Sequence, residues 1–178
     1  MKLVGLSGAI MGSKTAILVD EVIKRSEKLG ADIEVELIDM KDYKVEIIDG
    51  RPSDQYNDDT KTIIKKIVDA DFFVVGAPIY QASIPGVLKN LFDHLPMSVF
   101  ESKVVAMVTN GGTERHALVA ENQLKPILSF FKAIVCPTSV FVTSGAFNDK
   151  NEIVDENVSE RLDRLAEELV FLQTKLSN

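Results

Sequence analysis

Apolar residues follow two patterns along the chain, and the first is that of β-strands. Short runs that are apolar throughout, typical of strands buried on both faces of a sheet, occupy residues 3–6, 71–76 and 104–109. Residues 33–38 alternate apolar side chains with glutamate, as in a strand with one solvated face, and residues 134–143 form a further apolar run. The pattern therefore predicts five strands.

Helical spacing of apolar residues fills the intervals between these strands. The predicted helices span residues 16–29, 60–70, 114–131 and 158–176, and another opens at Ile84-Pro85-Gly86, with proline at the tolerated first-turn position. Alternating strands and helices predict an α/β fold with a doubly wound parallel sheet. Five strands fit the flavodoxin-like order 2-1-3-4-5, with helices on both faces, and residues 1–178 are then a single domain.

Residues 39–59 break this alternation. The segment is polar, rich in Asp and Tyr, and interrupted by Gly50 and Pro52. Connections this long are uncommon without a purpose, so one interpretation is a surface loop that covers a site. The other is a floppy insertion, and the sequence does not choose between them.

Composition and charge narrow the class of protein. A formal net charge of -7 without any Lys/Arg-rich block argues against nucleic acid or anionic lipid as a partner. No apolar run approaches the roughly 18–20 residues that cross a bilayer, and no signal-peptide pattern opens the sequence, so we expect a cytoplasmic protein. The one cysteine, Cys136, lies in an apolar run and is expected to be a core residue.

The first strand leads into a turn rich in glycine and hydroxyl residues. Ser7, Gly8, Gly12, Ser13 and Thr15 lie between that strand and the first predicted helix. Backbone N–H groups and the positive end of the helix dipole at such a junction favour an anion, most simply a phosphate. An ordinary helix N-cap at Ser13 is an equally acceptable interpretation.

Two nucleotide- or phosphate-handling folds compete with this interpretation. The P-loop pattern GxxxxGK[ST] fails at one position, where Ser13 replaces its second glycine, and the neighbouring strands end without the carboxylate that holds magnesium. A receiver-type phosphoacceptor needs aspartates after its first and third strands, where Ser7 and Ala77 stand. We therefore expect no metal site.

Ligands of doubly wound sheets bind beyond the carboxyl ends of the strands, where the strand order switches. Three turns meet there: residues 7–15, 78–83 and 109–113. Together they offer a phosphate pocket, an apolar and aromatic wall at Ile79-Tyr80, and the glycine pair Gly111-Gly112, whose bare backbone can approach a flat polar edge. This combination suits flavin mononucleotide (FMN).

Nearly the whole chain resembles the NAD(P)H-dependent FMN reductase family. The matching motifs are SGxxxGSKT at residues 7–15, PIYxxSIPGxLKNxxD at 78–93, and GGTxxH at 111–116 followed by LKP at 124–126. The second motif is the most specific, and the third is closest to the flavin reductases of alkanesulfonate monooxygenase systems.

The resemblance implies a role for each turn. Ser7, Ser13, Lys14 and Thr15 would hold the phosphate, Lys14 through its amide. The ring would be lined by Pro78, Ile79, Tyr80 and Ser83, and its pyrimidine edge would meet Asn110, Gly111 and Gly112. His116 is close to the third turn and would face the flavin or the nicotinamide; the alternative is a histidine that caps a helix or lies at the surface. FMN carries the chemistry, so no catalytic side chain is expected.

Two departures from the family pattern bear on these roles. Ala9 and Met11 stand where the family commonly has serine and arginine, which removes two phosphate contacts. Asn122 stands where reductases that release flavin carry an aromatic residue, which favours a flavin that stays bound.

The function that the resemblance implies is hydride transfer from NADPH or NADH to FMN, and then to free flavin, a quinone or an azo acceptor. A flavin-dependent monooxygenase is one candidate partner. The alternatives are a flavodoxin-type electron carrier without catalysis and, more remotely, a P-loop-like nucleotide binder. A side chain at Gly112 is expected to block flavin or to force an unfavourable φ.

A homodimer or homotetramer is expected, as in the family. Residues 91–100 and the helix containing Leu118, Leu124, Leu128, Phe130 and Phe131 carry more apolar side chains than one sheet-facing stripe requires.

Overall fold

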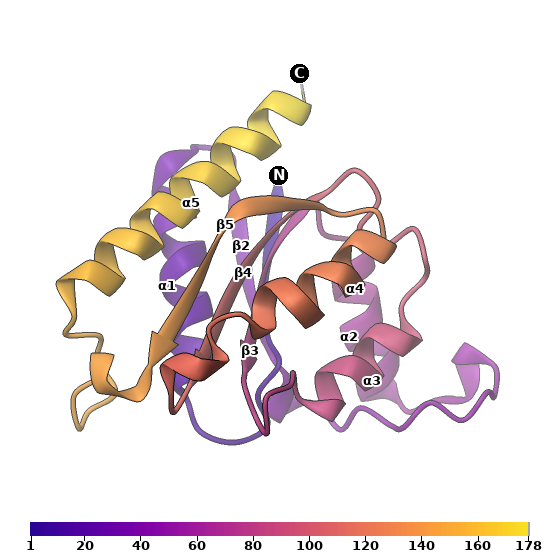
Figure 1. Ribbon diagram of the computed structural model, residues 1–178. Coiled ribbons are helices and arrows are strands. Elements are labelled where there is room, and N and C mark those ends of the chain that lie inside the picture. Colours follow the sequence, from indigo (N-terminus) through magenta and orange to yellow (C-terminus); the bar gives the residue numbers. More distant parts are fainter. Residues whose placement is uncertain (178) are drawn as a thin grey trace.

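A computed structural model describes residues 1–177 and shows the predicted sheet (Figure 1). Its five parallel strands lie in the order β2-β1-β3-β4-β5, which confirms the flavodoxin-like topology. The strands are β1 (Lys2–Ser7), β2 (Glu34–Asp39), β3 (Phe72–Pro78), β4 (Val104–Gly111) and β5 (Ile134–Thr143).

Helices cover both faces of this sheet (Figure 1). They are α1 (Lys14–Leu29), α2 (Asp58–Val68), α3 (Gly86–His94), α4 (Lys125–Phe130) and α5 (Glu156–Leu176). One core cluster joins the sheet to α1 and α5, and a second joins it to α2, α3 and α4. β1 and β3 are buried on both faces, as their unbroken apolar sequences predicted. None of the helices in residues 1–177 is long and apolar enough to cross a membrane.

Four helix starts differ slightly from the predicted ones, including that of α2, which begins at Asp58 rather than at residue 60. The α5 helix begins at Glu156 because the Asp155 side chain accepts hydrogen bonds from the Asn157 and Val158 amides. The spacing of apolar residues does not predict this start, because the first residues of the helix are polar. Pro85 caps α3 rather than lying in its first turn, and α1 begins at Lys14, directly after Ser13.

The single helix predicted for residues 114–131 is wrong. The structure has a 3₁₀ turn at Glu114–His116, a π-helical turn at Ala120–Leu124, and then α4. Pro126 lacks an N–H and its ring conflicts with the carbonyl four residues earlier, so a regular α-helix cannot run through this point. The wider π turn, in which the Lys125 N–H donates to the Ala120 carbonyl, precedes the proline.

The long segment after β2 packs on the α2 and α3 side. Tyr56 is buried against His94, with ring centroids 4.6 Å apart, and the Tyr56 hydroxyl donates to Asp49. The Glu46 carbonyl accepts from the Asn90 amide, while the Ile48 N–H donates back to the same side chain. The segment is thus fastened to α3, contrary to a floppy insertion.

Cys136 is fully buried beside α5, as predicted for a core residue. Burial raises the pKa of its thiol to about 12, and the nearby Glu168 carboxylate acts in the same direction. The thiol therefore stays protonated at neutral pH, and it has no thiolate with which to act as a nucleophile.

Candidate active site

A pocket of about 370 Å³ opens at the carboxyl ends of β1, β3, β4 and β5. Its volume lies in the range of roughly 300–1,000 Å³ typical of small-molecule and cofactor sites. The lining residues come from the turns that follow these four strands: Met11, Gly12, Ser13, Lys14, Thr15, Pro78, Ile79, Tyr80, Asn110, Gly111, Gly112, Ser144 and Asn151. Nine of the twelve predicted site residues line it, so the three predicted turns do meet.

The first turn presents the start of α1 to the pocket. Gly12 adopts a left-handed φ of 73°, a backbone conformation that glycine reaches without the strain other residues incur, just before the helix begins. The first helical residues, from Lys14 to Ile17, include no carboxylate, so nothing there neutralises the unpaired N–H groups. Ser13 precedes the helix, and within residues 1–177 its hydroxyl makes no capping hydrogen bond.

The Lys14 side chain contacts an aromatic ring. Its ammonium group lies over the Phe147 ring, 5.1 Å from the centroid. The prediction that Lys14 contributes its amide fits this placement. A second cation lies close to the turn, because Lys41 donates to the Gly12 carbonyl at 3.3 Å while pairing with Asp39.

A side-chain hydrogen bond connects the first turn to the third. The buried Thr15 hydroxyl donates to Asn110 Oδ1 at 2.7 Å. Because the amide oxygen is the acceptor, the Asn110 Nδ2 group remains a donor for the pocket. The Thr15 hydroxyl has its proton committed to Asn110, so the structure assigns it a different task from the phosphate contact that the motif suggested.

The second turn supplies the apolar wall. Pro78 ends β3, Ile79 is nearly buried, and Tyr80 is 36% exposed beside the pocket. The next two residues, Gln81 and Ala82, both adopt left-handed φ angles of 44° and 59°. This is the backbone of a tight two-residue turn, closed by hydrogen bonds in both directions between Tyr80 and Ser83.

The third turn differs from its prediction in two ways. Asn110 and Gly111 belong to β4, which runs two residues further than expected. The positive-φ glycines of the described chain are Gly12 and Gly50, so the expectation of an unfavourable φ at Gly112 is wrong. A Cβ built on Gly112 meets no atom of residues 1–177 within 4 Å, which makes this glycine an open part of the pocket wall.

Three predicted residues lie beside the pocket without lining it. Ser7 is completely buried beneath the first turn, and its hydroxyl has no hydrogen-bond partner among the described residues. Ser83 donates its hydroxyl to Gln123 at 2.7 Å. His116 packs against the back of Gly111, where a Cβ would approach its Nδ1 atom to 2.9 Å. The other nine predicted residues line the pocket.

Four lining residues are not among the twelve predicted site residues, and one of them, Gly12, belongs to the predicted first turn. Ser144 and Asn151 come from the segment after β5, and Asn151 has a left-handed φ of 60°. Their position follows from the same rule that located the other turns, since β5 also ends at this edge. Met11 places an exposed apolar side chain where the family commonly has arginine, while Ala9 is buried away from the pocket.

The donor set fits a flavin mononucleotide. The pocket lining combines helix N–H groups and a free serine hydroxyl, a tyrosine with apolar residues, and an amide donor beside two glycines. No cluster of three or more His, Cys, Asp or Glu side chains able to hold a metal occurs in the part of the chain that the structure describes.

Comparisons with known proteins agree with this geometry. The model of the family described as NADPH-dependent FMN reductase matches residues 1–148. An NAD(P)H-dependent FAD/FMN reductase of Geobacillus thermodenitrificans is 47% identical over 178 residues, covering all of this chain and 96% of the relative. An FMN reductase (NADPH) of Pseudomonas aeruginosa is 34% identical, over 94% of this chain and 89% of its own.

A solved structure of similar fold is the apo form of an NADH:FMN oxidoreductase. It superimposes with a TM-score of 0.80 at 24% identity, over 96% of this chain and 88% of the other. The family match and the full-length relatives identify this chain as a member of the NADPH-dependent FMN reductase family.

Proposed function

We propose that FMN binds in the pocket with its phosphate at the start of α1, its ring against Tyr80, and its pyrimidine edge at Asn110, Gly111 and Gly112. The observation that carries this assignment is the hydrogen bond from Thr15 to Asn110, which brings the phosphate turn and the glycine turn to one pocket. Ser13 and the N–H groups that follow it are the phosphate donors. In this arrangement residues 1–178 act as one FMN-binding domain.

Held by these residues, FMN would supply the hydride-transfer chemistry that links NAD(P)H to an acceptor. The protein holds the cofactor, orients it and tunes its charge. Donors at the Asn110 amide and at the Gly111 and Gly112 backbone favour negative charge at the pyrimidine edge. Ile79 and Tyr80 exclude water from one side of the ring. Because the cofactor carries the chemistry, the protein needs no general acid and general base.

NAD(P)H oxidation by the purified protein tests the activity. We expect steady consumption of NADPH or NADH, followed at 340 nm, that depends on FMN and an acceptor. A protein that binds FMN without oxidising either nucleotide would be a flavodoxin-type carrier. A colourless protein that does not bind added FMN but binds ATP with magnesium would support the P-loop interpretation.

The acceptor proposed here is free flavin, a quinone or an azo compound, with a flavin-dependent monooxygenase as the partner that consumes reduced flavin in the cytoplasm. Asn122 lies in the π turn, where its side chain donates to the Leu118 carbonyl. No aromatic ring occupies this position, and we propose that FMN is retained as a bound group between turnovers.

The proposed assembly is a symmetric homo-oligomer that uses the α3–α4 face. Most of the predicted apolar surplus packs inside one chain, where Leu91, Leu124, Leu128 and Phe131 are buried. Met97, Leu118 and Phe130 remain 71%, 67% and 67% exposed. A groove between α3 and α4 is lined by apolar side chains with Lys89 and Asp93 beside them, a pair of charges that a two-fold related copy can match.

Replacing Phe130 by Glu should reduce the mass of the particle to that of one chain, because a carboxylate would be buried at the proposed contact. Light scattering at micromolar concentration measures this mass. Phe171→Glu, at a phenylalanine of α5 that is 60% exposed, is the matched control and should leave the assembly intact. A wild-type protein of 19.6 kDa with full reductase activity would refute the oligomer.

A further inference from the structure

The turn from Tyr80 to Ser83 has a backbone that its own sequence does not favour. Its two central residues, Gln81 and Ala82, both lie in the left-handed region, at φ 44° and 59°. Two-residue turns of this kind normally carry Asn-Gly, because residues with a Cβ avoid positive φ. The turn therefore depends on support from outside itself.

Gln123 provides this support with both ends of its side-chain amide. Its Nε2 group donates to the Ala82 carbonyl at 2.8 Å, and its Oε1 atom accepts from the Ser83 hydroxyl at 2.7 Å. The amide thus binds the outer half of the turn at two adjacent residues. Tyr80, which lines the pocket, occupies the opposite end of the same turn.

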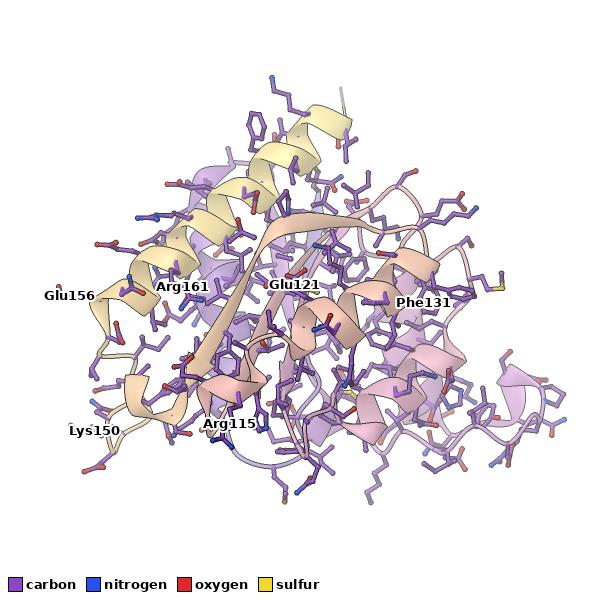
Figure 2. All side chains as sticks on the ribbon, in the orientation of Figure 1. Arg115, Glu121, Phe131, Lys150, Glu156 and Arg161 are labelled. Atoms are coloured by element: carbon purple, nitrogen blue, oxygen red, sulfur yellow. The ribbon has the colours of Figure 1, made fainter. Side chains whose placement is uncertain are left out.

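The π turn that carries Gln123 is itself anchored to the sheet. Glu121 accepts from the Ser139 hydroxyl on β5 at 2.8 Å and from the Lys125 ammonium at 2.9 Å. Figure 2 shows Glu121 at the side of the π turn and α4 that faces β5. A residue presented from this base can hold a neighbouring loop in place, and π turns often occur at functional positions.

We infer that Gln123 is a positioning residue of the flavin site: it fixes the Tyr80–Ser83 turn so that Ile79 and Tyr80 are preorganised against the flavin ring. The inference rests on the proposed placement of FMN and extends it to a residue outside the pocket. Gln123 acts through the turn, so its effect falls on the ring end of the cofactor and leaves the phosphate end unchanged.

The Gln123→Ala variant tests this directly. The affinities for FMN and for riboflavin should fall by the same factor, about tenfold, the equivalent of two neutral hydrogen bonds of modest net strength. In the ligand-free protein, amide hydrogen exchange of the peptide containing residues 80–83 should accelerate. Gln123→Glu, which keeps an acceptor for the Ser83 hydroxyl and loses the donor to Ala82, should give a smaller loss.

A rescue experiment separates positioning from direct contact. The double substitution Gln81→Asn and Ala82→Gly makes the turn favourable by itself. In the Gln123→Ala background it should restore the FMN and riboflavin affinities and slow the exchange again. In the wild-type background the same double substitution should change flavin affinity less than it does in the Gln123→Ala background, because Gln123 already holds the turn.

Three outcomes would overturn the inference: unchanged flavin affinity in Gln123→Ala, a loss confined to FMN with riboflavin unaffected, or a loss that the Asn-Gly turn does not rescue. A wild-type protein that binds no flavin would instead reject the proposed function. Amide hydrogen exchange distinguishes a failure of this inference from a failure of the proposed function. It reports on how Gln123 holds the Tyr80–Ser83 turn in the ligand-free protein, whether or not flavin binds.

Discussion

FMN is expected to bind the wild-type protein at least roughly a hundredfold more tightly than riboflavin. The two ligands differ only by the phosphate, and two charge-assisted hydrogen bonds, each of about 1.5–3 kcal/mol, suffice for this ratio. The start of α1 offers such donors together with the free Ser13 hydroxyl. Titration of the ligand-free protein with both flavins, followed by flavin fluorescence, gives the ratio, and equal affinities would reject the phosphate site.

Substitutions in the first turn should separate its two tasks. Ser13→Ala should weaken FMN about tenfold or more and leave riboflavin unchanged, because it removes one phosphate donor. Thr15→Ala should weaken both flavins, since its hydroxyl holds the Asn110 amide. Ser129→Ala, at an exposed serine of α4, is the control for a lost hydroxyl outside the pocket. An identical response of Ser13→Ala and Thr15→Ala would contradict this separation.

Gly112→Val is expected to abolish FMN binding while the protein stays folded. The new side chain would occupy the pocket wall, where the pyrimidine edge is placed. The fold should tolerate it, because a Cβ at this position meets no described atom within 4 Å and the φ angle is not left-handed. Equilibrium binding and thermal unfolding of the same sample measure the two effects.

Gly86→Val is the matched control for this substitution. Gly86 begins α3, and a Cβ there also has open space among the described residues, but it lies outside the pocket. Its variant should bind FMN like the wild type. Full flavin affinity and a normal redox potential in Gly112→Val would show that the third turn has been assigned the wrong role.

The sheet and most of the pocket could be predicted from the sequence, because strong and local signals specify them. Apolar runs such as Phe72–Pro78 identify buried strands, and strand order then brings their following turns to one edge. Glycine and hydroxyl residues within nine positions marked the first turn.

Other parts of the site depend on contacts that no local pattern records. Gln123 looks like any polar helix residue, and only the folded chain shows it bound to the Tyr80–Ser83 turn. The Thr15 hydroxyl matched a phosphate motif, yet the structure commits it to Asn110. Ser144 and Asn151 could have been found by applying the strand-end rule to β5, whereas the break before Pro126 needed attention to its missing N–H.

The segment between β2 and α2 has a consequence for how the molecule opens. It is held largely by polar contacts, including those of Asn90 and His94 with the Glu46 carbonyl, and by the burial of Tyr56. Structure of this kind opens locally at a lower free energy than global unfolding. Within the described chain, none of the residues from 42 to 57 lines the pocket. Local opening of this segment would therefore leave the residues that line the pocket in place.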